Sequence, residues 1–240
     1  MCIIAIQPLG VKINKQTLKN CWQSNNDGAG LMYIENGKIV VKRELESFDK
    51  FMKLKKYADS LNTNIVIHFR IATSGGINER NIHPFKINND LYFCHNGILD
   101  IEVPVNSPIN DTQIFNNCFM KGLPSEFQYN DSIMRLIEFT IGERNKFVFF
   151  DSLGNFHILN ENKGIWDGGA WYSNGSYKNM SSFCHYTPNK AWAKLNDEND
   201  SYFTCESCNE LHDIESMRYD DYFDMYFCEN CTDSLMATKD

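Results

Sequence analysis

The apolar residues of this chain occur in short runs, and no other feature limits its possible folds as strongly. The longest runs, at 2–6 and 147–150, have the length of a β-strand. Both fall far short of the roughly 20 residues needed to cross a bilayer. Strand-like segments separated by a few helical ones favour a layered α+β domain over a doubly wound parallel sheet. We therefore expect an α+β protein with no membrane span.

Local patterns predict strands and helices over the first two thirds of the chain. An Asn36-Gly37 pair between two apolar runs is a strong hairpin signal. The predicted strands are 2–7, 30–35, 38–42, 64–71, 90–95, 146–151 and 155–159. The predicted helices are 47–61, 111–120 and 131–141. We expect the glycine- and aromatic-rich segment 164–174 to be a surface hairpin with core aromatics rather than a lid over a site.

The charge balance changes near residue 196. Residues 196–240 carry 13 Asp and Glu against only Arg218 and Lys239, a net charge of −11, whereas residues 1–195 carry +3. The polar, non-periodic segment 196–201 is typical of a linker. Because domains usually hold about 100–200 residues, we expect a large domain over 2–195, a linker over 196–201 and a small module over 202–240.

The small module contains two C-x-x-C pairs. Nineteen residues separate Cys208 from Cys228, a spacing typical of a four-cysteine structural zinc site. Four thiolates complete a tetrahedron and leave no open position for catalysis. We expect one structural Zn²⁺ per chain and no cofactor for catalysis. The predicted zinc ligands are Cys205, Cys208, Cys228 and Cys231.

The acidity of the module also predicts its kind of partner. Contacts with nucleic-acid phosphates need Lys and Arg, and only Arg218 lies between the outer cysteines. We therefore expect the module to dock on a protein rather than on nucleic acid. The N-terminal residues lack the basic and apolar regions of a signal peptide. This predicts a cytoplasmic protein whose cysteines stay reduced.

Cys2 is the most informative single residue. Removal of Met1 would leave an α-amine beside the thiol of Cys2, and these groups titrate near ~7.7–8.0 and ~8.5. Such matched pKa values let the amine take the thiol proton and activate a nucleophile. For this position alone, the alternative interpretation is a small apolar residue that opens a strand.

Two further segments place polar groups at the ends of predicted strands. Residues 67–76 read I-H-F-R-I-A-T-S-G-G, so Arg70 and Thr73 come where a strand enters a glycine turn. Asn96-Gly97 follows the next strand and offers an amide side chain and an unhindered N–H, which is the geometry of an oxyanion hole. Taken singly, a solvated arginine and a hairpin turn would also explain these residues.

Three other motifs complete the series. A D-G-A-G turn occupies 27–30, N-I-H-P-F occupies 81–85, and Asp111 opens a predicted helix within N-D-T. Each has a simple structural explanation, since Asp111 can cap its helix and His83 can be a buried structural histidine.

In this order, Cys2 and these motifs resemble the class II glutamine amidotransferases, which are N-terminal-nucleophile hydrolases. The resemblance covers 2–113 through motifs and extends more loosely to about residue 180. It implies a four-layer αββα sandwich that hydrolyses the side-chain amide of glutamine. Ile71 and Ser74 stand where many members have Trp and His. The motifs are closer to small stand-alone members, including γ-glutamyl hydrolases.

The resemblance also implies roles for individual residues. One group forms a thioester and stabilises the oxyanion, and a second group holds the α-carboxylate and α-amine of the substrate. The residues are the nucleophile Cys2, the oxyanion pair Asn96 and Gly97, the carboxylate-binding Arg70 with Thr73, and the amine-binding Asp111.

Three functional hypotheses remain open at this point. The first is a glutaminase or amidotransferase domain, carrying a zinc ribbon, that passes ammonia to a separate acceptor enzyme. The second is a hydrolase of a substituted γ-glutamyl amide. The third is a non-catalytic adaptor that docks on a partner through the ribbon. The intact set of proposed catalytic and substrate-binding residues argues against it: Cys2, Arg70, Asn96, Gly97 and Asp111.

Overall fold

The computed structural model describes most of the first part of the chain and four short segments of the second. The described residues are 2–72, 76–104, 107–178, 202–204, 211–213, 216–220 and 225–229. The chain divides into two compact units, Met1–Ser181 and Ser182–Asp240. The linker expected at 196–201 lies outside the described residues and stays a prediction. Among the described residues, no helix has the length and apolar character of a membrane span.

Six antiparallel strands form the larger sheet of the first unit. In spatial order they are β3 (Lys38–Glu44), β2 (Ala29–Glu35), β4 (Ile65–Phe69), β1 (Ile3–Gln7), β10 (Ala170–Tyr172) and β9 (Ile165–Asp167). Strand β1 lies inside this sheet, with β4 on one side and β10 on the other. Because Ile3 pairs with Phe69, the start of β1 meets the end of β4.

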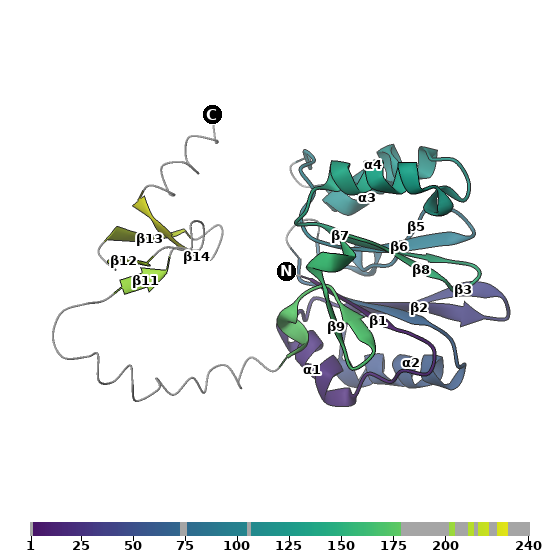
Figure 1. Ribbon diagram of the computed structural model, residues 1–240. Helices are drawn as coiled ribbons and strands as arrows, with labels where there is room; N and C mark the ends of the chain where they lie inside the picture. Colours follow the sequence, from purple (N-terminus) through teal and green to yellow (C-terminus); the bar gives the residue numbers. More distant parts are fainter. Residues whose placement is uncertain are drawn as a thin grey trace. The chain divides into compact units, whose positions relative to one another are not determined.

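Four antiparallel strands form the second sheet, and two pairs of helices cover the outer faces. The strands, in order, are β5 (Phe85–Lys86), β6 (Leu91–Asn96), β7 (Lys146–Asp151) and β8 (Phe156–Leu159). The larger sheet is covered by α1 (Lys15–Ser24) and α2 (Phe48–Ser60), as Figure 1 shows. The second sheet is covered by α3 (Asp111–Cys118) and α4 (Asp131–Ile141).

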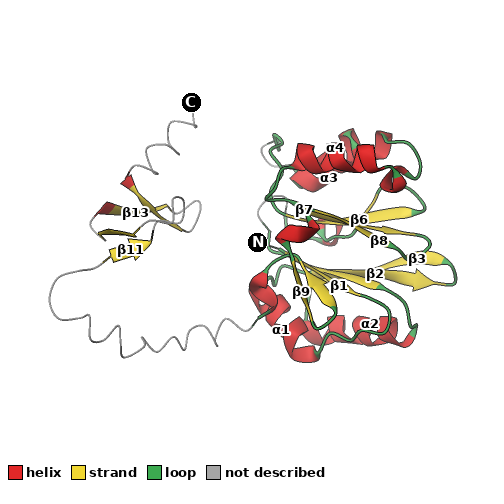
Figure 2. Cartoon of the chain, in the orientation of Figure 1, coloured by secondary structure: helices red, strands yellow, loops and turns green. Residues whose placement is uncertain are grey.

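Short 3₁₀ turns connect these elements (Figure 2). They are η1 (Glu79–Asn81), η2 (Met120–Gly122), η3 (Phe127–Tyr129), η4 (Glu161–Lys163) and η5 (Gly175–Tyr177). One residue separates η2 from α3, η3 from α4, and η4 from both β8 and β9.

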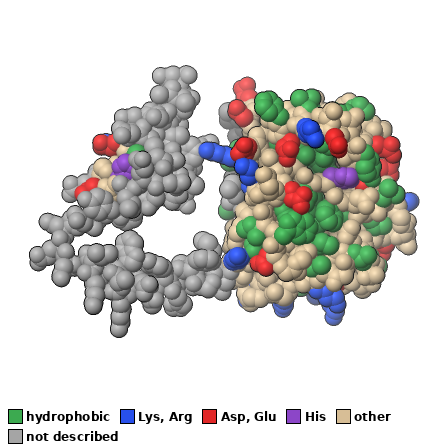
Figure 3. All heavy atoms as spheres, in the orientation of Figure 1, with side chains coloured by type: hydrophobic (Ala, Val, Ile, Leu, Met, Phe, Trp, Pro, Cys, Tyr) green, Lys and Arg blue, Asp and Glu red, His purple; other side chains and the backbone are tan. Residues whose placement is uncertain are grey.

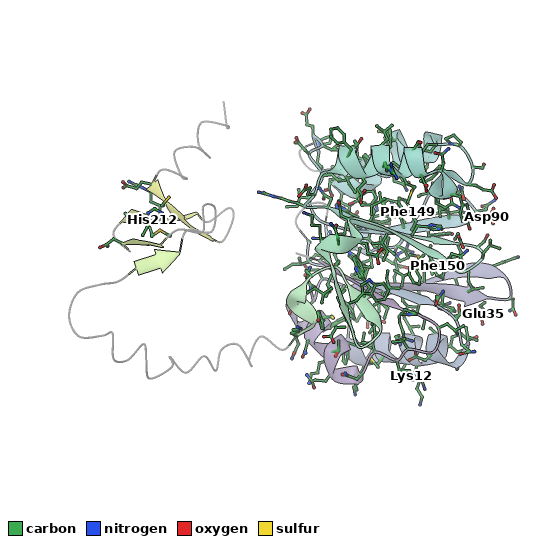
Figure 4. The ribbon with its side chains drawn as sticks, in the orientation of Figure 1. Lys12, Glu35, Asp90, Phe149, Phe150 and His212 are labelled. Atoms are coloured by element: carbon green, nitrogen blue, oxygen red, sulfur yellow. The ribbon has the colours of Figure 1, made fainter. Side chains whose placement is uncertain are left out.

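The inner strands β1, β4 and β7 are buried on both faces. Successive side chains of a strand point to opposite sides. In β1, Ile3 therefore packs in the core under α1 and α2, while Ile4 packs between the two sheets. In β7, Phe149 enters the core under α3 and α4, while its neighbour Phe150 enters the core between the sheets (Figure 4). The layers run α, β, β, α, so the predicted sandwich is confirmed.

The predicted strands and helices are all present, with shifted ends. The helix expected at 111–120 ends at Cys118, and Met120 starts a 3₁₀ turn. The sequence patterns missed α1, because only Leu18, Cys21 and Trp22 of its ten residues are apolar and their stripe is short. The hairpin expected at 164–174 is confirmed as β9 and β10, with Trp171 in the core.

The surface of the first unit carries charges of both signs. On the face that Figure 3 shows, Lys and Arg side chains are interspersed with Asp and Glu, and hydrophobic side chains gather near the middle. This mixture agrees with the nearly balanced charge of +3 over residues 1–195.

The described segments of the second unit form two hairpins. Strands β11 (Tyr202–Thr204) and β12 (Leu211–Asp213) pair antiparallel, as do β13 (Met217–Asp220) and β14 (Met225–Cys228). Cys228 is buried at the end of β14. The other three predicted zinc ligands, Cys205, Cys208 and Cys231, lie outside the described residues. Within the described part of the chain, no three His, Cys, Asp or Glu side chains form a metal-binding group.

Candidate active site

One pocket of the first unit brings together residues that are far apart in the sequence. Its walls include Cys2, Arg70, Gly97 and Asp111. Cys2 precedes β1, Arg70 follows β4, Gly97 follows β6, and Asp111 begins α3. The antiparallel pairing of β1 with β4 explains the first two, because it places the start of one strand beside the end of the other. The pocket lies where the ends of both sheets meet the start of α3.

The thiol of Cys2 is partly buried and contacts the backbone of Ile71. Its S–H donates to the Ile71 carbonyl at 3.4 Å, and the Ile71 N–H donates to Sγ at 3.4 Å. Burial raises the pKa of the Cys2 thiol, while the Ile71 N–H and the charge of Arg70 act in the opposite direction. Since burial dominates, the thiol keeps its proton at neutral pH. Nucleophilic attack by this sulfur therefore requires a nearby base.

Arg70 is held by the glycine turn that precedes β2. Its N–H donates to the Gly28 carbonyl at 2.8 Å, and its carbonyl accepts from the Asp27 N–H at 3.0 Å. The Asp27 carboxylate in turn accepts from the Ala72 N–H at 2.7 Å. Burial lowers the pKa of Arg70, and the nearby Cys2 and Asp27 oppose that change. A guanidinium stays charged at neutral pH even so, so the pocket offers a buried cation.

The Asn96 side chain lies beside Cys2 and contacts its main chain. Asn96 Nδ2 donates to the Cys2 carbonyl at 2.5 Å. Asn174, after β10, donates to the same carbonyl at 2.7 Å and to Asn96 Oδ1 at 3.3 Å. A primary amide carries two N–H donors, and the contact with Cys2 uses one donor of Asn96. These two asparagines thus fix the position of the Cys2 backbone.

Gly97 occupies a position that only glycine fits. Its φ is +147°, and a Cβ atom would lie 2.1 Å from Asn145 Oδ1. L-residues with a side chain rarely adopt this φ, and the contact itself is far below van der Waals distance. The absence of a side chain leaves the backbone of Gly97 open toward the pocket.

Asp111 is buried and lines the same pocket. It is the first residue of α3, whose N-cap is Asn110. Asp111 Oδ2 accepts from the Leu99 N–H at 2.9 Å, which ties the start of α3 to the loop that follows Gly97. A carboxylate is also favoured near the positive end of a helix. The pocket therefore presents an anion at Asp111 and a cation at Arg70.

Three histidines line or underlie this pocket. The rings of His68 and His83 lie 4.1 Å apart, and those of His83 and His95 lie 6.3 Å apart. Burial lowers the pKa of His68 to about 3, and burial also lowers the pKa of His83 and of His95. All three rings are therefore neutral at pH 7. His68 and His95 act as hydrogen-bonding groups rather than as charges.

The segment that carries His83 is fixed from outside. Arg43 of β3 donates to the carbonyls of Ile82 and Pro84, at 2.8 Å and 2.6 Å, on either side of His83. A side chain at Gly30 would collide with the His83 carbonyl, at 1.9 Å. This close approach explains one of the glycines of the D-G-A-G turn.

Of the residues predicted for the site, Cys2, Arg70, Gly97 and Asp111 share the pocket, and Asn96 contacts Cys2. Thr73 lies outside the described residues. The sequence reasoning missed Asn174 and Asn145. A signal existed for Asn174, because it ends the aromatic, glycine-rich segment 164–174. Nothing marked Asn145 in the sequence, since its role depends on its contact with Gly97.

No protein-family model matches the chain, and no curated protein matches it either. Solved structures do match. The chain is similar to glutamine phosphoribosylpyrophosphate amidotransferase from B. subtilis, with 15% identity over 72% of this chain and 41% of that chain, and a TM-score of 0.44. It is also similar to an allosteric regulatory enzyme of purine biosynthesis, with 17% identity over 72% and 41% of the two chains and a TM-score of 0.42.

A third similar structure is a glutamine aminotransferase class-II domain protein from Silicibacter pomeroyi. Its identity is 12% over 72% of this chain and 87% of that chain, with a TM-score of 0.39. The matched region spans only 41% of the length of each of the first two structures. The first of these structures is named as a glutamine amidotransferase and the third as a class-II domain protein.

Proposed function

We propose that this protein hydrolyses the side-chain amide of glutamine through a thioester on Cys2. One observation carries the proposal: a thiol, a buried cation, a buried anion and a glycine turn, drawn from four elements of the fold, line the same pocket. An α-amino acid carries one charge of each sign on its head group. The pocket supplies Arg70 for the carboxylate and Asp111 for the amine, each as a charge-assisted contact.

The proposed reaction begins when the α-amine of Cys2, exposed by removal of Met1, takes the thiol proton. The sulfur then attacks the amide carbon, and the carbonyl oxygen becomes an oxyanion. The N–H of Gly97 and the second N–H of Asn96 stabilise this charge. One such donor typically contributes about 2.7–4 kcal/mol to transition-state stabilisation.

Ammonia leaves as the C–N bond breaks and takes the proton back from the Cys2 amine. Water then attacks the thioester, which releases glutamate and restores the thiol. Because the Cys2 thiol is protonated at neutral pH, the amine is an essential part of this proposal. We further propose that a separate acceptor enzyme receives the ammonia.

The second unit is proposed to hold one structural Zn²⁺ through Cys205, Cys208, Cys228 and Cys231. Four thiolates suit zinc and complete its coordination. Cys228, the one ligand within the described residues, is buried at the end of β14 rather than exposed as a reactive thiol. The zinc takes no part in the reaction at Cys2.

The test is hydrolysis by the full, zinc-replete chain with Met1 removed. Glutamine and a panel of substituted γ-glutamyl amides would each be supplied, and released glutamate measured. We expect glutamine to be hydrolysed, with no turnover by Cys2→Ala and normal turnover by Cys118→Ala, an exposed cysteine outside the pocket. Turnover of a substituted amide but not of glutamine would overturn the proposed substrate while keeping the chemistry. No turnover of any γ-glutamyl amide would overturn the function.

A further inference from the structure

The imidazole of His95 connects two walls of the pocket. Its Nδ1 lies 2.7 Å from Thr112 Oγ1 at the start of α3. Its Nε2 lies 2.7 Å from Asn145 Oδ1, in the turn before β7. His95 is 2% exposed and lines the pocket. Both ring nitrogens are therefore already bonded to protein groups, which distinguishes His95 from His83.

The contacts of Asn145 fix the position of the proton on this ring. Asn145 Nδ2 donates to the Ile141 carbonyl at 2.6 Å, so its Oδ1 faces His95. An amide oxygen only accepts, and His95 Nε2 must therefore carry the proton. The neutral ring then accepts at Nδ1 from the hydroxyl of Thr112. That hydroxyl has a single proton, which leaves its 3.4 Å approach to Asp111 Oδ1 a weak contact.

The same oxygen of Asn145 also packs against Gly97. A Cβ atom at Gly97 would lie 2.1 Å from Asn145 Oδ1 and 3.0 Å from Asn145 Cα. The backbone of Asn145 is itself held, because Asn160 Nδ2 donates to its carbonyl at 2.7 Å. Asn145 is thus a fixed support behind the glycine turn. His95 holds the side chain of that support in place.

We infer that His95 and Asn145 are positioning residues that set the two halves of the pocket relative to each other. Through Asn145, the imidazole orients the Gly97 N–H toward the oxyanion. Through Thr112, it holds the first turn of α3, which carries Asp111 toward the substrate amine. The inference rests on the proposed function for its catalytic meaning. The hydrogen bonds themselves are testable without activity.

Steady-state kinetics can separate the two connections of His95, through Asn145 to Gly97 and through Thr112 to α3. Asn145→Ala is expected to lower kcat on the order of 10- to 100-fold with KM within about threefold, because oxyanion contacts act mainly in the transition state. Thr112→Val is expected to raise KM on the order of tenfold with kcat within about threefold. His95→Leu breaks both connections and should show both effects. His157→Gln, a histidine that contacts Asp151 away from the pocket, should match the wild type.

Conservative variants distinguish the loss of one hydrogen bond from general misfolding of the variant. Asn145→Asp keeps an acceptor oxygen opposite His95 Nε2, and it should recover most of the kcat that Asn145→Ala loses. His95→Gln can place its amide N–H where Nε2 donates to Asn145, but it has no acceptor atom at the position of Nδ1 facing Thr112, and it should resemble Thr112→Val. Equal losses in kcat and KM for Asn145→Ala and Thr112→Val would overturn the inference, since a merely structural role predicts no split.

Nitrogen NMR of the histidine rings gives a readout that needs no substrate. We expect His95 to be the neutral Nε2–H tautomer at pH 7, and we expect Asn145→Ala to shift the backbone amide signal of Gly97. An Nδ1–H tautomer, or an unmoved Gly97 signal, would overturn the inference even in an active enzyme. If the wild type hydrolyses no γ-glutamyl amide, the proposed function fails, and these two signals alone decide whether His95 and Asn145 position Gly97.

Discussion

The two units place their cysteines by different physical means. In the first unit, the pairing of β1 with β4 positions Cys2, and buried apolar side chains hold that pairing in place. In the second unit, the sequence predicts that four cysteines are organised by a metal ion. A segment of about 40 residues rarely buries enough surface to fold without metal or disulfides. The comparison teaches that the position of Cys2 depends on the fold of the first unit, whereas the fold of the second unit is expected to depend on the metal that its four cysteines bind.

The strongest test of the fold-dependent site is loss of its nucleophile. Cys2→Ala removes the only atom proposed to form the thioester, so we expect turnover to fall at least about 10⁴-fold. A glutamine-like electrophile should label the wild type once per chain and the variant not at all, as measured by intact mass. Cys118→Ala should label normally. Labelling that survives the loss of Cys2 would mean that another thiol reacts.

Retention of Met1 should have the next largest effect. Burial raises the pKa of the Cys2 thiol, and with Met1 attached the nitrogen of Cys2 belongs to a peptide bond and cannot accept the thiol proton. We expect turnover to fall on the order of 10²- to 10³-fold, in line with the contribution of a general base. Mass spectrometry of matched preparations, with Met1 and without, would be paired with glutamate release. Full activity of the Met1 form would rule out the amine as base.

Acid should unfold the first unit through its histidine cluster. The folded pKa of His68, about 3, lies below the unfolded value near 6.5, so the unfolded chain binds the extra proton as the pH falls. The stability that His68 contributes is present above pH ~6.5 and is lost toward pH 3. His83 and His95 shift in the same direction. Protonation of His68 in the unfolded chain should cost about 1.4 kcal/mol of stability per pH unit in this range.

Urea unfolding of the first unit between pH 7 and pH 4 measures this slope. His68→Gln should reduce the slope by about one histidine's share, whereas His157→Gln, outside the cluster, should leave it unchanged. A slope that does not depend on His68 would show that other groups drive the acid sensitivity.

Gly97→Ala should lower the stability of the first unit moderately and should clearly lower kcat. The new Cβ would meet Asn145 Oδ1 in a backbone conformation that disfavours a side chain. We expect a loss of about 1–3 kcal/mol in the free energy of unfolding and a kcat reduced on the order of 100-fold. Gly10→Ala, also at positive φ but with no atom within 4 Å of the added Cβ, controls for backbone strain. Equal effects of the two variants on kcat would remove Gly97 from the site.

The sequence predicted those residues of the site whose side chains or backbone groups take part directly in the proposed chemistry. Cys2, Arg70, Asn96-Gly97 and Asp111 stand at strand or helix ends, where each has a simple structural explanation by itself, and it was their order along the chain that pointed to a site. Asn145 could not be found this way, because its effect comes from packing against Gly97, 48 positions away. Helix α1 was missed for a related reason. Only Leu18, Cys21 and Trp22 of its ten residues are apolar, and tertiary contacts such as that of the Asn20 amide with the Tyr177 carbonyl add to this short stripe.

Loss of zinc should leave the pocket almost untouched, and this smallest effect tests the comparison most directly. The residues proposed for hydrolysis all belong to the first unit, where the described strands and helices position them without any ligand from the second. The double variant Cys205→Ser/Cys228→Ser in the full chain should bind no zinc, against one per wild-type chain, because two remaining thiolates cannot complete the tetrahedron. Its glutamate release should stay within about twofold of the wild type, and only association with a partner enzyme should be lost.

Elemental analysis and glutamate release on the same samples measure both outcomes. If hydrolysis falls along with zinc content while the first unit keeps its urea midpoint, the second unit helps to form the pocket, and the contrast between the two cysteine sites fails.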